Sequence, residues 1–346
     1  MKRTELLFER PAALQATEPP EARGLARDEV RLLVSTPEGH IHSTFNQLDN
    51  FLEPGDLLIV NHSATLPASL PASGAIGNFM VNLSTNYGNG LWLSEPRWGS
   101  NQPGVLPLAA GERINVAGIP VRLVTPYPAL PRLWFVQAEG DLCAAMEKTG
   151  SPIRYGYVPT PYPLAAYQTI FAKIPGSAEM PSAGRPFTRR LLRTLHARGI
   201  QLAGITLHTG VSSLEVETEE VEQQPLYAEP FHVPLGTAAA INTARREKRR
   251  VIAVGTTVVR ALESAWDGKQ VQAARGFTRL YVHPGRGVYT VDGLLSGLHD
   301  PLASHLAMLY AIASPELIRS AYQVAVEQGY LWHEFGDSHL ILPGRA

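Results

Sequence analysis

The clearest pattern of apolar and polar residues in this chain lies in residues 251–264. Residues 251–254 form an uninterrupted apolar run, typical of a strand that is buried on both faces. Gly255 then allows a sharp turn, and Thr256 or Thr257 can cap a helix whose apolar residues recur at helical spacing. The stretch therefore predicts a strand that leads directly into a helix.

The first turn of this predicted helix is favourable for binding an anion. Its unpaired N–H groups would lie at the carboxyl end of the strand, where ligands bind in open α/β sheets. Arg260 and Glu263 lie three positions apart, on one face of the helix. The simpler interpretation is an ordinary β-α unit with a surface ion pair.

Strand and helix patterns alternate on both sides of residues 67–149, as is typical of an α/β fold. The predicted strands are residues 30–35, 40–45, 57–60, 201–207, 251–254 and 279–282. The predicted helices are residues 48–52, 187–198, 237–248, 302–312 and 315–328.

Residues 67–149 have a different pattern, with short strands between Gly, Pro and Asn turns. The predicted strands are residues 79–84, 113–117, 121–125 and 133–137, and one helix follows at 141–148. We therefore predict a discontinuous α/β sandwich domain, residues 1–66 and 150–346, interrupted by a small β-barrel domain, residues 67–149. The alternative is one irregular mixed domain.

Composition and charge exclude several classes of protein. The net charge is −1 at pH 7, so the chain has no overall positive field to attract nucleic acid, although a local basic patch can still exist. The single cysteine, Cys143, excludes an intramolecular disulfide and a Cys-rich zinc site, and we expect no metal cofactor. No apolar run reaches the roughly 18 residues of a membrane span, and the N-terminus lacks a signal-peptide core. We expect a cytoplasmic monomer or homodimer without membrane contact.

Polar residues cluster where predicted strands end, and several clusters form motifs. They include Asn61-His62-Ser63, Thr206-Leu207-His208-Thr209-Gly210, Pro181-Ser182-Ala183-Gly184-Arg185-Pro186-Phe187-Thr188, Gly255-Thr256-Thr257, Val291-Asp292-Gly293-Leu294, and Phe335-Gly336-Asp337. With these motifs, in this order, the chain resembles the S-adenosylmethionine:tRNA ribosyltransferase-isomerase family of queuosine biosynthesis. The resemblance spans essentially the whole chain.

The resemblance implies the same α/β domain with an inserted β-barrel, and an unusual use of S-adenosylmethionine. In this family the ribosyl unit is transferred to the aminomethyl group of a 7-deazaguanine base in tRNA, while adenine and methionine leave. A base must take a C5′ hydrogen made acidic by the sulfonium, and adenine needs a proton or hydrogen bond to leave.

Three residues are candidates for catalysis. His208 matches a histidine of the family, and its ordinary pKa near 6.5 suits proton transfer, although a structural histidine explains it equally well. Glu229 is the only residue kept from the family segment His-x-x-His-x-Glu. Asp337 can bind ribose or lie near the sulfonium, although Gly-Asp is also a common turn dipeptide.

The remaining candidates would bind the cofactor. Thr256, Thr257 and Arg260 fit a site for the methionine carboxylate, made of helix N–H groups and a guanidinium. Asn61 follows a strand in the same way, and Asp292 can bind ribose hydroxyls. Capping and turn formation are the structural alternatives for these residues.

Several polar family residues are replaced in this chain. Pro186 stands where the family has histidine, residues 297–303 lack the usual lysine, and Ser212-Ser213-Leu214 replaces Gly-Thr-Phe. Three hypotheses remain open: the tRNA-modifying enzyme, a paralogue that applies the same cofactor chemistry to a small amine or a free deazapurine, and a binding protein without catalysis.

Two groups of basic residues bear on RNA binding. Arg185, Arg189, Arg190 and Arg193 form a predicted patch that can neutralise tRNA phosphates. Residues 245–250 form a second group, which equally fits cations at the carboxyl end of a helix.

Overall fold

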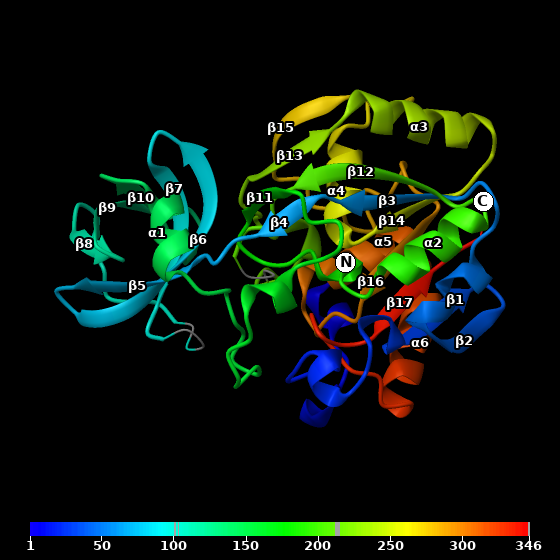
Figure 1. The fold of residues 1–346 in the computed structure, drawn as a ribbon, viewed down its shortest axis with the longest axis horizontal. Coiled ribbons are helices and arrows are strands. Elements are labelled where there is room, and N and C mark those ends of the chain that lie inside the picture. The colour runs from blue at the N-terminus through cyan, green and yellow to red at the C-terminus, as the bar shows by residue number, and fades with distance from the viewer. Residues whose placement is uncertain (100–101, 103, 212–214, 345–346) are drawn as a thin grey trace.

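A nine-stranded sheet forms the centre of the computed structural model (Figure 1), which describes residues 1–99, 102, 104–211 and 215–344. The strand order is β15-β13-β12-β3-β14-β16-β17-β1-β2. The strands are β1 Arg31–Thr36, β2 Gly39–Thr44, β3 Leu57–Asn61, β12 Gln201–Leu207, β13 Glu229–Val233, β14 Val251–Val254, β15 Ala274–Thr278, β16 Gly293–Gly297 and β17 Ser338–Ile341. The neighbours β12, β3, β14 and β16 run parallel, so their carboxyl ends meet at one edge.

Helices cover both faces of this sheet. They are α2 Arg189–Ala197, α3 Leu235–Arg246, α4 Thr256–Ser264, α5 Ser304–Ile312 and α6 Pro315–Glu327, with the 3₁₀ helix η5 at Phe45–Phe51. Val251 and Ala253 pack in one core with α3 to α6, whereas Ile252 and Val254 pack in the other core with η5 and α2. Strand β14 is therefore buried on both faces, as its uninterrupted apolar run predicts.

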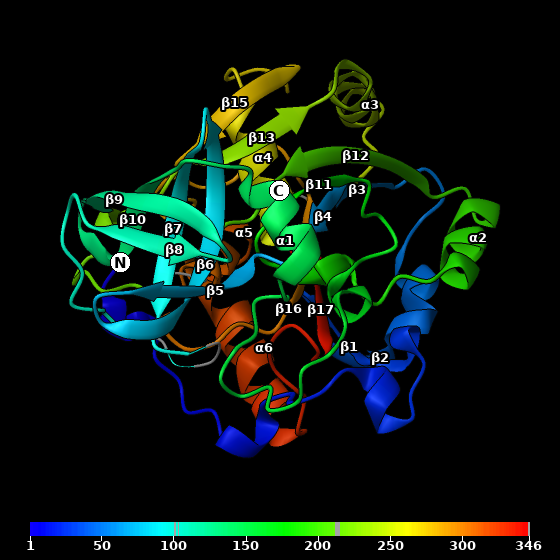
Figure 2. The ribbon, with the colours of Figure 1, turned by 60° about the vertical axis from the view of Figure 1, so that its left-hand side comes forward.

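A closed six-stranded barrel lies to one side of the sheet in Figure 1 and comes to the front in Figure 2. Its strands are β5 Ser69–Gly74, β6 Gly77–Gly88, β7 Leu91–Arg97, β8 Arg113–Val116, β9 Ile119–Tyr127 and β10 Leu130–Ala138. Helix α1, Leu142–Thr149, contacts β5. A short parallel pair, β4 Ser63–Thr65 with β11 Ile174–Ser177, joins the segments that enter and leave the barrel. The predicted fold class is confirmed, and the domain limits at 66 and 150 stay predictions.

Two local predictions are wrong. Residues 279–282 are not a strand, because β15 ends at Thr278 and Leu280 turns inward, where its carbonyl accepts a hydrogen bond from Arg260. The N-cap of α4 is Gly255, and no threonine side chain caps this helix. No helix among the described residues is long and apolar enough to cross a bilayer.

Gly255 has a backbone conformation, φ +97° and ψ 151°, that is essentially restricted to glycine. We predict that Gly255→Ala lowers the free energy of unfolding by about 1–3 kcal/mol in urea denaturation. Gly236→Ala is the control, because Gly236 lies inside α3 with open space around it, where alanine should be neutral or stabilising. Equal effects of the two substitutions would contradict the prediction.

Candidate active site

Two adjoining pockets lie at the carboxyl edge of the parallel strands, and both are lined by Thr209, Thr256, Thr257 and His305. The wide pocket is also lined by Tyr155, Glu179, Ser182, His299, His333 and Glu334, among others. The arginine pocket is also lined by Tyr227, Glu229, Arg260, Tyr281 and Met308, among others. Their empty volumes, which include the solvent at the open mouth, are about 700 and 550 Å³.

The start of α4 forms the wall between the two pockets. Thr256 and Thr257 are buried there. The Asn61 side-chain amide donates to the Leu207 carbonyl at 2.8 Å and to Thr257 Oγ1 at 3.2 Å, and its oxygen accepts from the backbone of Ser63 and Leu207. Asn61 therefore orients Thr257 without lining either pocket.

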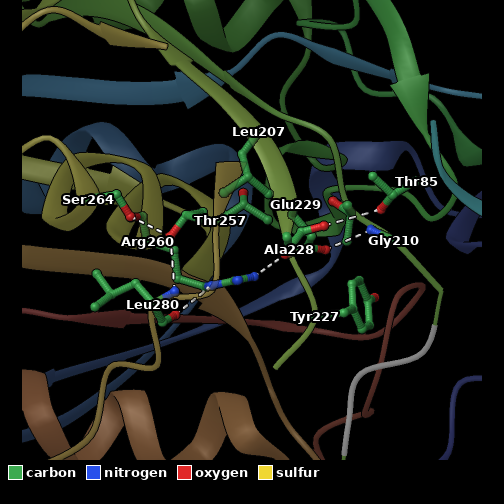
Figure 3. Close-up of polar contacts among 12 residues, drawn as sticks. Thr85, Leu207, Gly210, Tyr227, Ala228, Glu229, Thr257, Arg260, Ser264 and Leu280 are labelled. Atoms are coloured by element: carbon green, nitrogen blue, oxygen red, sulfur yellow. Dashed lines mark hydrogen bonds and ion pairs between the residues drawn. The ribbon is translucent and has the colours of Figure 1, made fainter. Parts of the chain in front are cut away.

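A buried ion pair between Arg260 and Glu229 forms one wall of the arginine pocket (Figure 3). Arg260 also donates from Nε to the Leu280 carbonyl at 3.1 Å, and Glu229 accepts from the Gly210 N–H at 2.7 Å. The alternative of a surface ion pair between Arg260 and Glu263 is wrong, because α4 is buried and the two side chains pair with different residues, Arg260 with Glu229 and Glu263 with Arg286.

Three buried polar atoms that line the arginine pocket have no hydrogen-bond partner within the described part of the chain. They are Arg260 Nη2, Thr209 Oγ1 and Tyr281 Oη. Buried polar groups in folded proteins are rarely left unpaired, because each one loses its hydration. Their convergence on one pocket indicates a polar ligand.

The wide pocket contains acidic and imidazole groups with displaced pKa values. Burial, and then the charge of Glu179, raise the pKa of Glu334 to about 8. Burial lowers the pKa of His305 and of His333 to about 4, and that of His299 well below its usual value. At neutral pH the pocket therefore contains a protonated carboxyl group and neutral imidazoles.

Sequence reasoning missed Tyr155, Glu179 and Glu334, although two of them had a signal. Glu179 lies two residues before the Pro181 motif, and Glu334 directly precedes the Phe335-Gly336-Asp337 motif. Ionisable residues next to a family motif are therefore candidates for the pocket wall.

The other predicted catalytic residues lie outside the pocket walls. His208 shares a hydrogen bond of 2.7 Å with Ser63, and burial lowers its pKa; its neighbour Thr209 lines both pockets. Asp337 is buried and accepts from the backbone N–H groups of Arg31 and Leu331, each at 2.8 Å. Their catalytic roles stay predictions.

Asp292 lies at the opposite end of β14 from Gly255. Its carboxylate accepts from the Val251 N–H at 2.8 Å and lines a separate pocket with Arg250. The structure thus brings Glu229, Thr256, Thr257 and Arg260 together and leaves Asp292 apart, so its predicted contact with ribose needs a different site.

Comparisons with known proteins identify the family. The family model described as queuosine biosynthesis protein matches residues 3–341. Two relatives, both named S-adenosylmethionine:tRNA ribosyltransferase-isomerase, are each 36% identical to this chain. For the relative from Thermus thermophilus the match covers 91% of this chain and 93% of the relative. For the relative from Rubrobacter xylanophilus it covers 99% of this chain and 98% of the relative. A crystal structure of S-adenosylmethionine tRNA ribosyltransferase from Thermotoga maritima has 25% identity and a TM-score of 0.55, covering 98% of this chain and 100% of that chain.

The chain belongs to the queuosine biosynthesis protein family. The resemblance inferred from the sequence motifs is therefore confirmed, and the chain is an enzyme of the transferase-isomerase class.

The residues of this chain that depart from the family pattern differ in their position relative to the two pockets. Pro186 is buried and lines neither pocket. Leu298 and His299, from the segment that lacks the lysine, line the wide pocket. Ser212-Ser213-Leu214 lies outside the described residues.

The predicted RNA patch of this family member needs one correction. Arg185 is only 3% exposed, because it is held by Glu21 and the Ala166 carbonyl, and it cannot reach a phosphate. Arg189 and Arg193 are exposed, and Arg190 is bound to Asp28. In the second basic group, Arg249 and Arg250 hold the Gly55–Asp56 turn, which favours the structural interpretation.

The buried ion pair between Arg260 and Glu229 predicts how the free energy of unfolding differs between single and double variants. We expect Arg260→Met to lower the free energy of unfolding by about 3–5 kcal/mol, because Glu229 is left buried and unpaired. The double variant Arg260→Met/Glu229→Gln should recover much of this loss in urea denaturation. Additive losses would mean that the two charges are not coupled.

Proposed function

We propose that this enzyme transfers the ribosyl moiety of S-adenosylmethionine to a 7-aminomethyl-7-deazaguanine base in tRNA and isomerises it. The product would be epoxyqueuosine, with release of adenine and methionine. The observation that carries the proposal is the set of unpartnered polar atoms in the arginine pocket, beside the first turn of α4. The names of the relatives support the donor and the tRNA acceptor.

The arginine pocket suits the methionine part of the donor. Arg260 Nη2 has no partner among the described residues, so it can bind a carboxylate while Nη1 stays paired with Glu229. The N–H groups of the first turn of α4 favour the same charge. Leu226 and Met308 supply apolar lining for the thioether chain, so the nucleoside would extend into the wide pocket.

Glu229 and Glu179 are the carboxylates that line the pockets and could take the C5′ proton. Glu229 is already held by Arg260 and by the Gly210 N–H. His208 lines neither pocket, and its Nδ1 shares a hydrogen bond with Ser63. It would have to reach the donor past Thr209, which lines both pockets. We keep Glu229 and His208 as proposed catalytic residues, and substituting each of them separately distinguishes their roles.

The decisive experiment is incubation with S-adenosylmethionine and tRNA carrying the deazaguanine base, followed by mass spectrometry of adenine, methionine and the nucleoside. Release of adenine together with a modified nucleoside supports the proposal. Release with a small amine and no RNA would favour the paralogue hypothesis. Binding without release would favour a protein that has lost catalysis.

We predict that Arg260→Lys weakens S-adenosylmethionine binding by about 1–3 kcal/mol, which is about 5- to 150-fold in Kd. Lysine keeps the charge that pairs with Glu229 but lacks the second guanidinium nitrogen. Calorimetry measures the affinity, and a circular dichroism melt confirms the fold. Unchanged affinity in a folded variant would remove Arg260 from the donor site.

We predict that tRNA affinity falls with salt, because each phosphate contact releases counterions. Replacing Arg189, Arg190 and Arg193 together by glutamine should reduce the slope of log K against log salt by about 2–3. The variant Arg246→Gln/Lys248→Gln, near the end of α3, is the control. A slope that the triple variant leaves unchanged would exclude α2 from the RNA interface.

A further inference from the structure

Glu334 stands on a tightly fixed turn at the wall of the wide pocket. The turn closes through the Gly336 N–H to the His333 carbonyl at 2.9 Å, and the flanking Trp332 and Phe335 are buried. Gly336 admits no side chain, because a Cβ would lie 2.3 Å from the Leu331 carbonyl oxygen. The packing therefore fixes the position from which Glu334 enters the pocket.

Asp337 closes the base of this loop. Its carboxylate accepts from the N–H groups of Leu331 and Arg31, and its own N–H donates to the Leu331 carbonyl at 2.8 Å. His333, next to Glu334, has φ +75°, a conformation that a non-glycine residue keeps only where its surroundings impose it. Such fixed and strained backbone is found at functional sites more often than elsewhere.

One oxygen of the Glu334 carboxyl group is not used by the described part of the fold. Its Oε1 is buried without a hydrogen-bond partner among the described residues, although the residue is partly exposed through the pocket. A buried structural carboxyl group would normally be paired. This geometry leaves the group available to a ligand.

The groups that face Glu334 come from several segments. They are Glu179, Arg185, Tyr155, Tyr157, Tyr167 and His333. Tyr155 donates to Glu179 Oε2 at 2.5 Å, Arg185 is paired with Glu21, and Tyr157 binds His333. Tyr167 Oη, like Glu334 Oε1, is buried without a hydrogen-bond partner among the described residues, whereas the other groups are held by partners of their own.

We propose that Glu334 is the proton donor to the departing purine, a role that rests on the proposed function. When the bond between the sugar carbon and the purine nitrogen breaks, its electron pair goes to that nitrogen. The nitrogen takes the carboxyl proton of Glu334, so that neutral adenine leaves and Glu334 becomes a carboxylate. Solvent at the open mouth of the pocket restores the proton.

The neighbours of Glu334 suit this step less well. Glu179 already accepts a hydrogen bond from Tyr155. The imidazoles of His305 and His333 have pKa values lowered by burial to about 4 and carry no extra proton at neutral pH. Burial and the charge of Glu179 raise the pKa of Glu334 to about 8, so this carboxyl group is protonated at neutral pH.

The test is the variant Glu334→Gln, measured by adenine release with saturating S-adenosylmethionine and deazaguanine tRNA from about pH 6 to about pH 10. We expect kcat to fall about 100- to 10,000-fold while the Kd for S-adenosylmethionine changes less than about threefold. The wild-type decline near pH 8, where Glu334 ionises, should disappear from the residual rate. Glu327→Gln, an exposed carboxylate on α6, is the control.

A second variant, Glu179→Gln, tests the same group through its neighbour. Removing the negative charge of Glu179 makes Glu334 easier to ionise, so the alkaline decline in rate should move to lower pH.

The stability of the protein gives a second measurement, which does not depend on activity. Because the folded pKa of Glu334 is raised, wild type loses stability relative to Glu334→Gln as pH rises from about 4.5 to about 8.

The outcomes separate this inference from the proposed function. If wild type releases adenine and Glu334→Gln keeps its rate or its alkaline decline, Glu334 is not the donor while the function stands. A lower melting temperature with an unchanged pH profile would assign Glu334 a structural role only. If wild type releases no adenine, the proposed function and this role both fail.

Discussion

The buried pair between Arg260 and Glu229 is the interaction on which the site depends. It links α4 to β13, and through the Gly210 N–H it also holds the segment that follows β12. Removing two charges from water is costly unless their remaining donors and acceptors are satisfied. Here Glu229 is satisfied and Arg260 is not, because Nη2 has no partner among the described residues. The pair thus supplies a fixed cation that still has one donor for a ligand.

The pockets occur where the two parts of the fold meet. Val211 and Tyr227, which come from the segment between β12 and β13, pack in the barrel core rather than in either core of the sheet. Ser84 of the barrel accepts from the Val211 N–H at 3.0 Å, and Tyr87 donates to the Ala228 carbonyl. A shift of the barrel would therefore move the segments that carry Thr209 and Glu229.

Burial controls the chemistry of the wide pocket. Desolvation is the largest cause of the displaced pKa in Glu334, His299, His305 and His333, and it favours the neutral form of each. The pocket is therefore rich in ionisable groups and poor in charge. Such surroundings strengthen hydrogen bonds to a bound ligand and keep a carboxyl proton available at neutral pH.

The sequence by itself determined the elements with strong local patterns and the family. The apolar run 251–254 needed burial on both faces, and the glycine after it allowed a conformation closed to other residues. Short strands between turn residues likewise indicated a barrel, and the closed sheet agrees. Ordered motifs over the whole chain indicated the queuosine biosynthesis family.

Only the tertiary structure decided which polar residues share a site. Asp292 and Thr256 both adjoin β14 in space, but they lie at opposite ends of it. The sequence predicts Arg185 as a surface cation, but in the folded chain Arg185 is paired with Glu21, 164 positions away. Glu179 and Glu334 interact although they are likewise far apart in the sequence. Local patterns cannot report such pairs, because burial and pKa depend on neighbours that the chain brings together only when it folds.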